Sequence, residues 1–110
     1  MNNHSSIEPA ELAARLRGAQ PPRLLDVRQA EEHAFAALPG AHLIPLAELP
    51  ARSAELEAWR GKDVVVYCHH GMRSQRAVEW LRQRGFTRLL NLTGGIDRWS
   101  LEVDPTLPRY

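Results

Sequence analysis

The sequence contains only one cysteine, so no disulfide can form within this chain of 110 residues. It has no long apolar run and no leader-like segment, which argues against a membrane span and favours a reducing cytoplasm. The formal net charge is +1, so the basic surface typical of nucleic-acid binding is missing, as is an acidic tail for a cationic partner. We therefore expect a cytoplasmic protein with neither a nucleic-acid nor a membrane partner.

The composition that is present suits one globular domain, with 44% hydrophobic and 25% charged residues. Short β-prone runs alternate with stretches of helical spacing, which predicts an α/β fold with a parallel sheet and helices on both faces. Residues 1–6 are expected to form a flexible end, 7–103 the domain and 104–110 an irregular tail. Expected strands are 23–27, 41–44, 64–67 and 87–92; expected helices start at Ile7 (with Ser6 as cap) and span 28–37, 47–59 in two pieces, and 74–84.

The stretch DVVVYCHHGMR, residues 63–73, organises the chain. A β-prone run leads into Cys68, a short polar turn follows, and a helix is expected from Ser74. In parallel α/β sheets ligands bind at the carboxyl ends of the strands. There the thiol faces the N–H groups of a tight loop and the positive end of a helix, which favour the nucleophilic thiolate.

Each residue of this loop has a chemical interpretation. Cys68 is the candidate nucleophile, since no other thiol exists. Gly71 can take a positive φ and let the loop curl with its N–H groups inward. Arg73 would present a planar fork of donors to the oxygens of an anion. His69, His70 and Met72 would line the mouth of the loop, where a histidine can dock an anion or move a proton.

Three stretches together resemble a rhodanese domain. Leu24-Leu25-Asp26-Val27-Arg28 with Glu32, then Leu38-Pro39-Gly40-Ala41 and Ile44-Pro45-Leu46, resemble its first half. Residues 65–74 resemble its C-x-x-G-x-R loop, and residues 91–99 its closing G-G-[I/F]-x-x-W segment. The chain departs from the usual pattern at Ala36, Ala37 and Leu38, in a connecting segment.

The resemblance implies a rhodanese-like three-layer fold with a five-stranded parallel sheet. It also implies thiosulfate sulfurtransferase activity. In that reaction the cysteine takes a sulfane sulfur from a small anionic donor such as thiosulfate, holds it as a persulfide, and passes it to cyanide or to a protein or small thiol. No cofactor is implied.

Plainer interpretations exist for the same residues. A lone cysteine at a strand end is often a small buried hydrophobe. Adjacent histidines on a turn rarely converge on one ion, so we expect no metal site. Asp26, Arg28 and Glu32 suit a structural network behind the loop better than catalysis. Gly94 and Gly95 are typical of a turn that passes close to another backbone.

Rival functions also remain open. Cysteine phosphatases and arsenate reductases enclose a larger oxyanion with a longer segment between cysteine and arginine than the four residues found here. A non-enzymatic docking module would not need the cysteine. A sulfur carrier with a protein acceptor would keep the cysteine and its chemistry.

Overall fold

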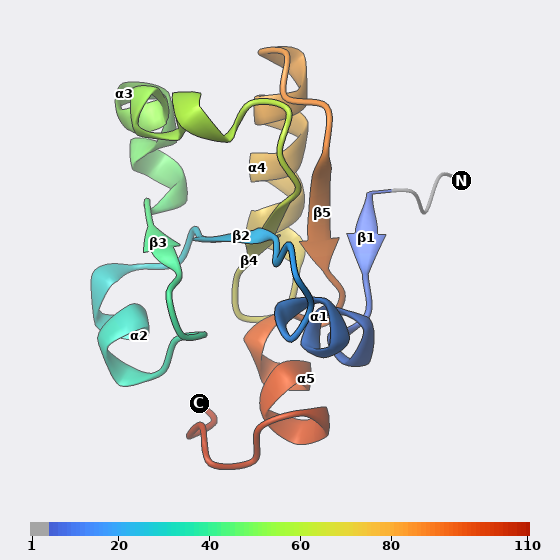
Figure 1. The fold of residues 1–110 in the computed structure, drawn as a ribbon. Coiled ribbons are helices and arrows are strands. Elements are labelled where there is room, and N and C mark those ends of the chain that lie inside the picture. Colours follow the sequence, from blue (N-terminus) through green and yellow to red (C-terminus); the bar gives the residue numbers. More distant parts are fainter. Residues whose placement is uncertain (1–4) are drawn as a thin grey trace.

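The computed structural model describes residues 5–110, which build a five-stranded sheet whose described pairings are all parallel (Figure 1). The strand order is β1-β5-β4-β2-β3, so β4 lies in the middle between β5 and β2. The strands are β1 (Ser6–Ile7), β2 (Arg23–Asp26), β3 (His42–Leu43), β4 (Val64–Tyr67) and β5 (Leu89–Leu92). The predicted α/β class and five-stranded parallel sheet are confirmed.

Helices cover both faces of this sheet. The α-helices are α1 (Pro9–Leu16), α2 (Ala30–Phe35), α3 (Leu49–Arg52), α4 (Met72–Gln83) and α5 (Gly95–Glu102), and the 3-10 helices are η1 (Leu46–Glu48) and η2 (Ser53–Trp59). Side chains of α3, η2 and α4 pack in one apolar cluster, and side chains of α1 and α5 pack in the other.

The central strand β4 explains why two clusters form. Val64 and Val66 belong to the α4 cluster, while Val65 and Tyr67 belong to the α1 and α5 cluster, because successive strand residues point to opposite faces. All four residues are buried, as expected for a parallel strand covered on both sides. Each such side chain contributes roughly 1.5–3 kcal/mol by leaving water. The buried strand therefore gives Cys68, which follows it, a rigid base.

The N-terminal expectation was partly wrong. Ser6 does not cap α1, because Ser6 and Ile7 form β1 and pair with Asn91 and Leu92 of β5. Ile7 is 2% exposed, and its side chain belongs to the apolar cluster of α1 and α5, so this burial favours a strand over the expected helix at Ile7. The helix begins at Pro9, whose fixed φ suits a first helical turn.

Three of the predicted helical stretches differ from the observed helices. The helix expected from Arg28 begins only at Ala30, because the Arg28 N–H binds Asp26 Oδ1 at 2.9 Å and the chain turns there. The helix expected from Ser74 begins two residues earlier, at Met72, directly after Gly71 with φ +114°. The helix pieces expected within 47–59 are three short segments, η1, α3 and η2. The earlier start of α4 brings the N–H of Ser74 into its first turn.

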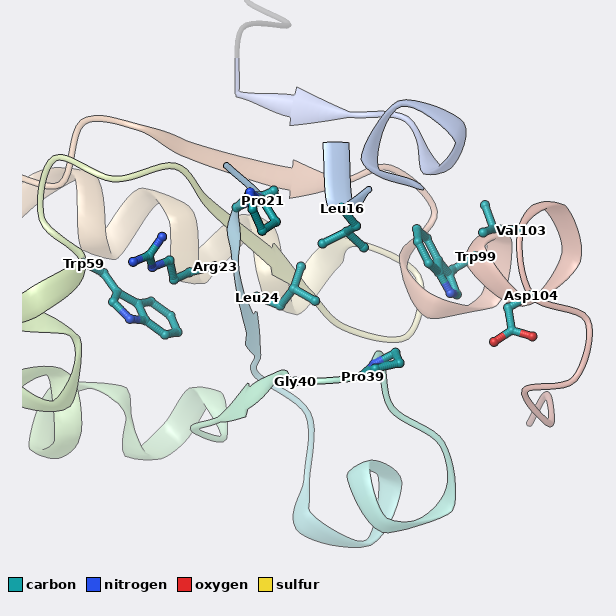
Figure 2. Close-up of a pocket in the computed structure, with 11 residues that line it drawn as sticks. Leu16, Pro21, Arg23, Leu24, Pro39, Gly40, Trp59, Trp99, Val103 and Asp104 are labelled. Carbon is teal, nitrogen blue, oxygen red and sulfur yellow. The ribbon is translucent and has the colours of Figure 1, made fainter. Parts of the chain in front are cut away.

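A groove of about 660 Å³ lies beside the α1 and α5 cluster (Figure 2), and Cys68 is not among the residues that line it. Its lining is mostly apolar and includes Leu16, Leu24, Pro39, Trp59, Trp99 and Val103. No thiol or histidine lines it, so the candidate chemistry lies elsewhere. Among residues 5–110, no helix has the length and apolar character needed to cross a bilayer.

Candidate active site

Cys68 lies at the carboxyl end of the central strand, where the sequence placed the nucleophile. Its side chain is only 1% exposed. The Sγ atom accepts the backbone N–H of Gly71 at 3.1 Å and the backbone N–H of Ser74 at 3.4 Å. Because Ser74 is in the first turn of α4, the sulfur also faces the positive end of that helix. Two N–H groups and the N-terminus of α4 thus present the positive ends of their dipoles to the sulfur.

The opposite side of the same loop is held by α5. The carbonyl of Cys68 accepts the N–H of Ile96 at 2.9 Å, and the carbonyl of His69 accepts the N–H of Asp97 at 3.1 Å. Gly95 permits this close approach, because a Cβ built on it would lie 2.3 Å from the His69 carbonyl oxygen. The expectation that Gly94 and Gly95 pass close to another backbone is confirmed. The loop carbonyls thus point toward α5 while N–H groups point at the sulfur.

A hydroxyl and an amide complete the surroundings of the sulfur. Ser74 Oγ lies 3.3 Å from Cys68 Sγ and donates to Asn91 Oδ1 at 2.5 Å. The Asn91 Nδ2 group donates to the carbonyl of Gly71 at 3.1 Å and to Gln75 Oε1 at 3.2 Å. These two donations fix which way the amide faces, so Asn91 joins β5 to the thiol loop and to α4.

Arg73 is oriented by Glu32, a contact that the sequence did not predict. Its Nη1 and Nη2 atoms bind the two carboxylate oxygens of Glu32 at 2.7 and 3.0 Å. The bond from Arg73 lowers the pKa of Glu32 to about 2, so the carboxylate is ionised at neutral pH. The remaining N–H groups of Arg73 have no partner among residues 5–110. One edge of the guanidinium is therefore held, and the other is free to meet an anion.

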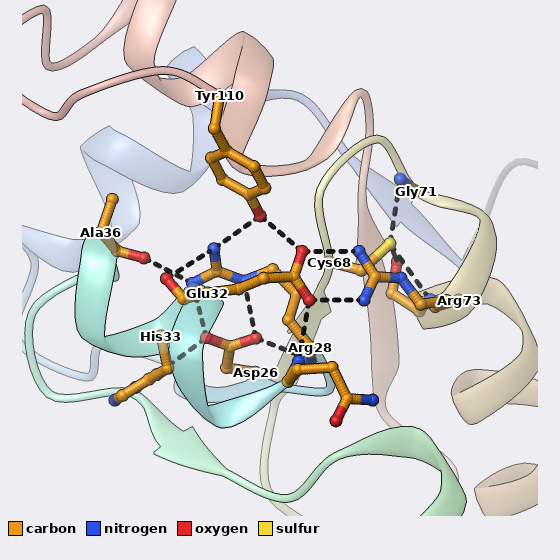
Figure 3. Close-up of polar contacts among 11 residues, drawn as sticks. Asp26, Arg28, Glu32, His33, Ala36, Cys68, Gly71, Arg73 and Tyr110 are labelled. Atoms are coloured by element: carbon orange, nitrogen blue, oxygen red, sulfur yellow. Dashed lines mark hydrogen bonds and ion pairs between the residues drawn. The ribbon is translucent and has the colours of Figure 1, made fainter.

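Asp26 and Arg28 form a fully buried pair behind this contact (Figure 3). Arg28 Nε and Nη2 bind the Asp26 carboxylate at 2.9 and 2.7 Å, and Nη2 also binds the carbonyl of Ala36 at 2.6 Å. Arg28 Nη1 donates to the carbonyl of Glu32 at 3.3 Å and to the hydroxyl of Tyr110 at 2.8 Å. The network lies against the segment that carries Glu32.

The two histidines lie at the mouth of the loop. The ring centroids of His69 and His70 are 3.8 Å apart. The ring of Tyr110 also stacks on the ring of His69, with centroids 3.9 Å apart and an angle of 8° between the two planes. Burial, and then the charge of His70, lower the pKa of His69, so its ring is neutral at pH 7. Met72 projects outward and is 76% exposed.

A group of metal-ligand type occurs at this mouth. Ligand atoms of His69, His70 and Asp97 lie within 4.8 Å of one another, closer than expected for adjacent histidines on a turn. Both carboxylate oxygens of Asp97 already bind Arg109, at 2.9 and 3.3 Å. A cation would have to displace the Arg109 guanidinium from Asp97, so we assign no metal site to these three residues.

Comparison with known proteins identifies the family of this fold. The family model described as "Rhodanese-like domain" matches residues 8–102. The chain belongs to the rhodanese-like domain family.

Relatives agree with this assignment. A protein named "Sulfurtransferase" from Allochromatium vinosum is 36% identical over 96 residues, which cover 87% of this chain and 88% of that protein. "Adenylyltransferase and sulfurtransferase MOCS3-1" from Zea mays is 44% identical over 96 residues, which cover 83% of this chain. The match covers only 20% of that maize protein. The solved "Rhodanese-like Domain Protein from Staphylococcus aureus" superposes with a TM-score of 0.82 at 30% identity, covering 96% of this chain and 98% of that one.

The rhodanese-like domain brings the sequence-predicted residues together around Cys68. Gly71 donates its N–H to Cys68 Sγ, and Glu32 links Arg28 and its partner Asp26 to Arg73 of the loop. Sequence reasoning expected the start of the helix at Ser74 to face the thiol, but it missed three side-chain partners: the Ser74 hydroxyl, Asn91 and Tyr110. Ser74 and Asn91 had a signal, since both lie in the stretches that resemble the family. Tyr110 had none, because it lies in the tail without helix or strand.

Replacing Gly95 with alanine should destabilise this rhodanese-like domain by about 2 kcal/mol or more, through strain at φ +62° and contact with the His69 carbonyl. Gly40→Ala is the matched control, since Gly40 has φ +79° with nothing within 4 Å of a built Cβ. It should cost only about 1 kcal/mol. Urea unfolding of the two variants measures the difference, and equal losses would contradict the close approach.

The Glu32–Arg73 pair predicts a pH dependence of stability. The folded pKa of Glu32 is about 2 against an ordinary 4.5, so its contribution is complete above pH 4.5 and is lost as the pH falls toward 2. That contribution is on the order of 3 kcal/mol, at about 1.4 kcal/mol for each pKa unit. Glu32→Gln should therefore be less stable than wild type at pH 7 and approach it near pH 2. Denaturant unfolding across this range measures the gap, and a gap independent of pH would refute the pairing.

Proposed function

We propose that this chain is a sulfurtransferase that moves a sulfane sulfur from a small anionic donor such as thiosulfate to a thiophilic acceptor through a Cys68 persulfide. The observation that carries the proposal is the Cys68 sulfur at the focus of the Gly71 and Ser74 N–H groups. Two relatives with "sulfurtransferase" in their names support it. The acceptor is cyanide or a thiol, small or on a protein.

The first half-reaction starts from the Cys68 thiolate. The sulfur attacks the outer sulfur of thiosulfate, the sulfur–sulfur bond of the donor breaks, and its electron pair leaves with sulfite. A new sulfur–sulfur bond joins Cys68 to the transferred atom, whose negative charge faces the inward N–H groups of the loop. The free edge of Arg73 binds donor oxygens before and during the transfer.

The second half-reaction returns the Cys68 sulfur to its thiolate form. Cyanide or a thiolate attacks the outer sulfur of the persulfide and takes it as thiocyanate or as a new persulfide, and the bonding pair returns to Cys68 as thiolate. Neither half needs a general acid when the leaving group is sulfite or a stabilised thiolate. This agrees with a neutral His69 whose ring is packed between His70 and Tyr110.

The surroundings of the loop suggest where a larger acceptor would approach. His70 and Met72 are among the exposed side chains at the mouth, so a protein thiol would meet them first. A reducing compartment such as the cytoplasm would keep Cys68 as a thiol or thiolate. A sulfur carrier without turnover of its own, or a docking module, would use the same surface and differ in whether Cys68 takes up sulfur.

Replacing Cys68 with serine should abolish thiosulfate:cyanide sulfurtransferase activity, because a hydroxyl at this position cannot hold a sulfane sulfur. Mass spectrometry of the wild-type protein after thiosulfate should find one added sulfur atom, on the peptide that contains Cys68. Cyanide should remove that atom. A serine variant with the wild-type rate, or hydrolysis of an aryl phosphate with no sulfur uptake, would refute the assignment. Sulfur uptake without turnover would favour the carrier.

Replacing Arg73 with alanine should raise the KM for thiosulfate about tenfold and lower kcat by less, because the guanidinium binds ground state and transition state alike. The unpaired Glu32 carboxylate adds repulsion of the donor. Arg73→Lys keeps the charge without the planar fork, so its KM should fall between the two. Steady-state kinetics at several thiosulfate concentrations measures this, and an unchanged KM in Arg73→Ala would remove the anion-binding role.

A further inference from the structure

Tyr110 lies in the tail that was expected to be irregular, yet its side chain contacts Arg28, Glu32 and His69. Figure 3 shows its hydroxyl between Arg28 and Glu32. Its hydroxyl accepts from Arg28 Nη1 at 2.8 Å and donates to Glu32 Oε2 at 2.9 Å. Its ring stacks on His69 with centroids 3.9 Å apart. One side chain therefore reaches the support network, the partner of Arg73 and the histidine next to Cys68.

The hydroxyl of Tyr110 completes the hydrogen bonding of a buried guanidinium. Arg28 has five N–H donors, and Asp26, Ala36 and the Glu32 carbonyl accept four of them. The fifth goes to Tyr110. Because this oxygen accepts from Arg28, its own proton is directed to the Glu32 carboxylate. Burial raises the pKa of Tyr110, so that proton stays in place at neutral pH.

The Glu32 carboxylate is in turn held from both sides. Oε1 accepts the N–H of Gln29 at 2.8 Å as well as Arg73 Nη1, and Oε2 accepts the Tyr110 hydroxyl as well as Arg73 Nη2. Without the Tyr110 hydroxyl, Glu32 Oε2 would have one remaining hydrogen-bond partner, the Nη2 group of Arg73. The direction of the guanidinium then depends on a carboxylate with one fewer anchor.

We propose that Tyr110 is a positioning residue that acts through Glu32 to aim the free edge of Arg73 at anions approaching Cys68. The inference deepens the proposed function, on which its kinetic readout rests. The hydroxyl, rather than the aromatic ring, carries the effect, so Tyr110→Phe separates the two: it removes both hydrogen bonds and retains the stack on His69.

The first measurement needs no turnover. Cys68 is alkylated with iodoacetate, which is anionic, and with iodoacetamide, which is neutral, and the ratio of the two rate constants is taken. The ratio cancels changes in thiol reactivity and reports a positive charge aimed at incoming anions. It should fall about threefold or more in Tyr110→Phe and in Arg73→Ala. In the double variant it should fall no further than in Arg73→Ala alone, because the two residues act in series.

The second measurement is kinetic. Tyr110→Phe should raise the KM for thiosulfate about threefold to tenfold with kcat nearly unchanged, and should have little effect in the Arg73→Ala background. Tyr67→Phe is the matched control, as Tyr67 is the other tyrosine of the chain. Its hydroxyl accepts the N–H of Leu38 at 3.1 Å and lies beside Asp26, but among residues 5–110 it makes no hydrogen bond to Glu32. The Tyr67→Phe variant should lower thermal stability and leave the alkylation ratio and KM as in wild type.

The outcomes separate the two proposals. A wild-type protein without sulfur transfer contradicts the proposed function, and the alkylation ratio then decides the role of Tyr110 alone. A folded Tyr110→Phe variant with a wild-type ratio overturns the positioning role. So does an effect of equal size with and without Arg73, which would show that Tyr110 acts elsewhere.

Discussion

The peptide groups of the thiol loop face two ways, and the remainder of the site depends on this division. N–H groups of Gly71 and Ser74 point at the sulfur, while carbonyls of Cys68 and His69 point at the first turn of α5. A buried carbonyl without a partner would cost roughly 1–3 kcal/mol, so the donors of α5 are needed to keep this arrangement. The closing segment of the chain is thus part of the active site without touching sulfur.

From the interior to the surface, charged groups then connect the sheet to the mouth of the loop. Asp26 and Arg28 are both fully buried, which is costly unless every donor and acceptor finds a partner. The hydroxyl of Tyr110 supplies the last acceptor for Arg28 and passes a hydrogen bond on to Glu32. Hydrogen bonds therefore run without a break from the buried Asp26–Arg28 pair to the partly buried Glu32–Arg73 pair.

Much of the fold could be predicted because local patterns and tertiary packing agree in its centre. The β-prone run Val64–Tyr67, which leads into Cys68, is predicted as a strand from its composition alone. The helix after Gly71 is predicted from apolar residues that recur at helical spacing. Ser6 and Ile7 could not be placed, since a strand of two residues has no periodicity of its own and exists only by pairing with β5. Arg28 lies outside the helix that was predicted to begin there, because its N–H closes a local turn onto the Asp26 carboxylate and the helix starts only after Gln29.

The site was harder to predict where it depends on contacts distant in sequence. Cys68, Gly71 and Arg73 are neighbours in the chain, and the chemistry of each follows from its type. The Glu32–Arg73 pair spans 41 positions and the Tyr110–Glu32 bond spans 78, and a single sequence gives no measure of such proximity. The order of motifs brought Glu32 to attention, whereas nothing marked a tyrosine in a stretch with two prolines.

The pairing of Arg73 with Glu32 weakens the long-range attraction of Arg73 for anions but fixes the orientation of its guanidinium. An isolated guanidinium would draw anions more strongly, but its side chain has about 2 kcal/mol of rotamer freedom to lose on binding. The carboxylate offsets much of the positive field and fixes one edge of the group, so the other edge needs little ordering when a donor arrives. A site built in this way discriminates by the geometry of the oxygens that it meets at close range. In the proposed mechanism, the anchors of Glu32, rather than the net charge at the mouth, would then decide which anions bind next to Cys68.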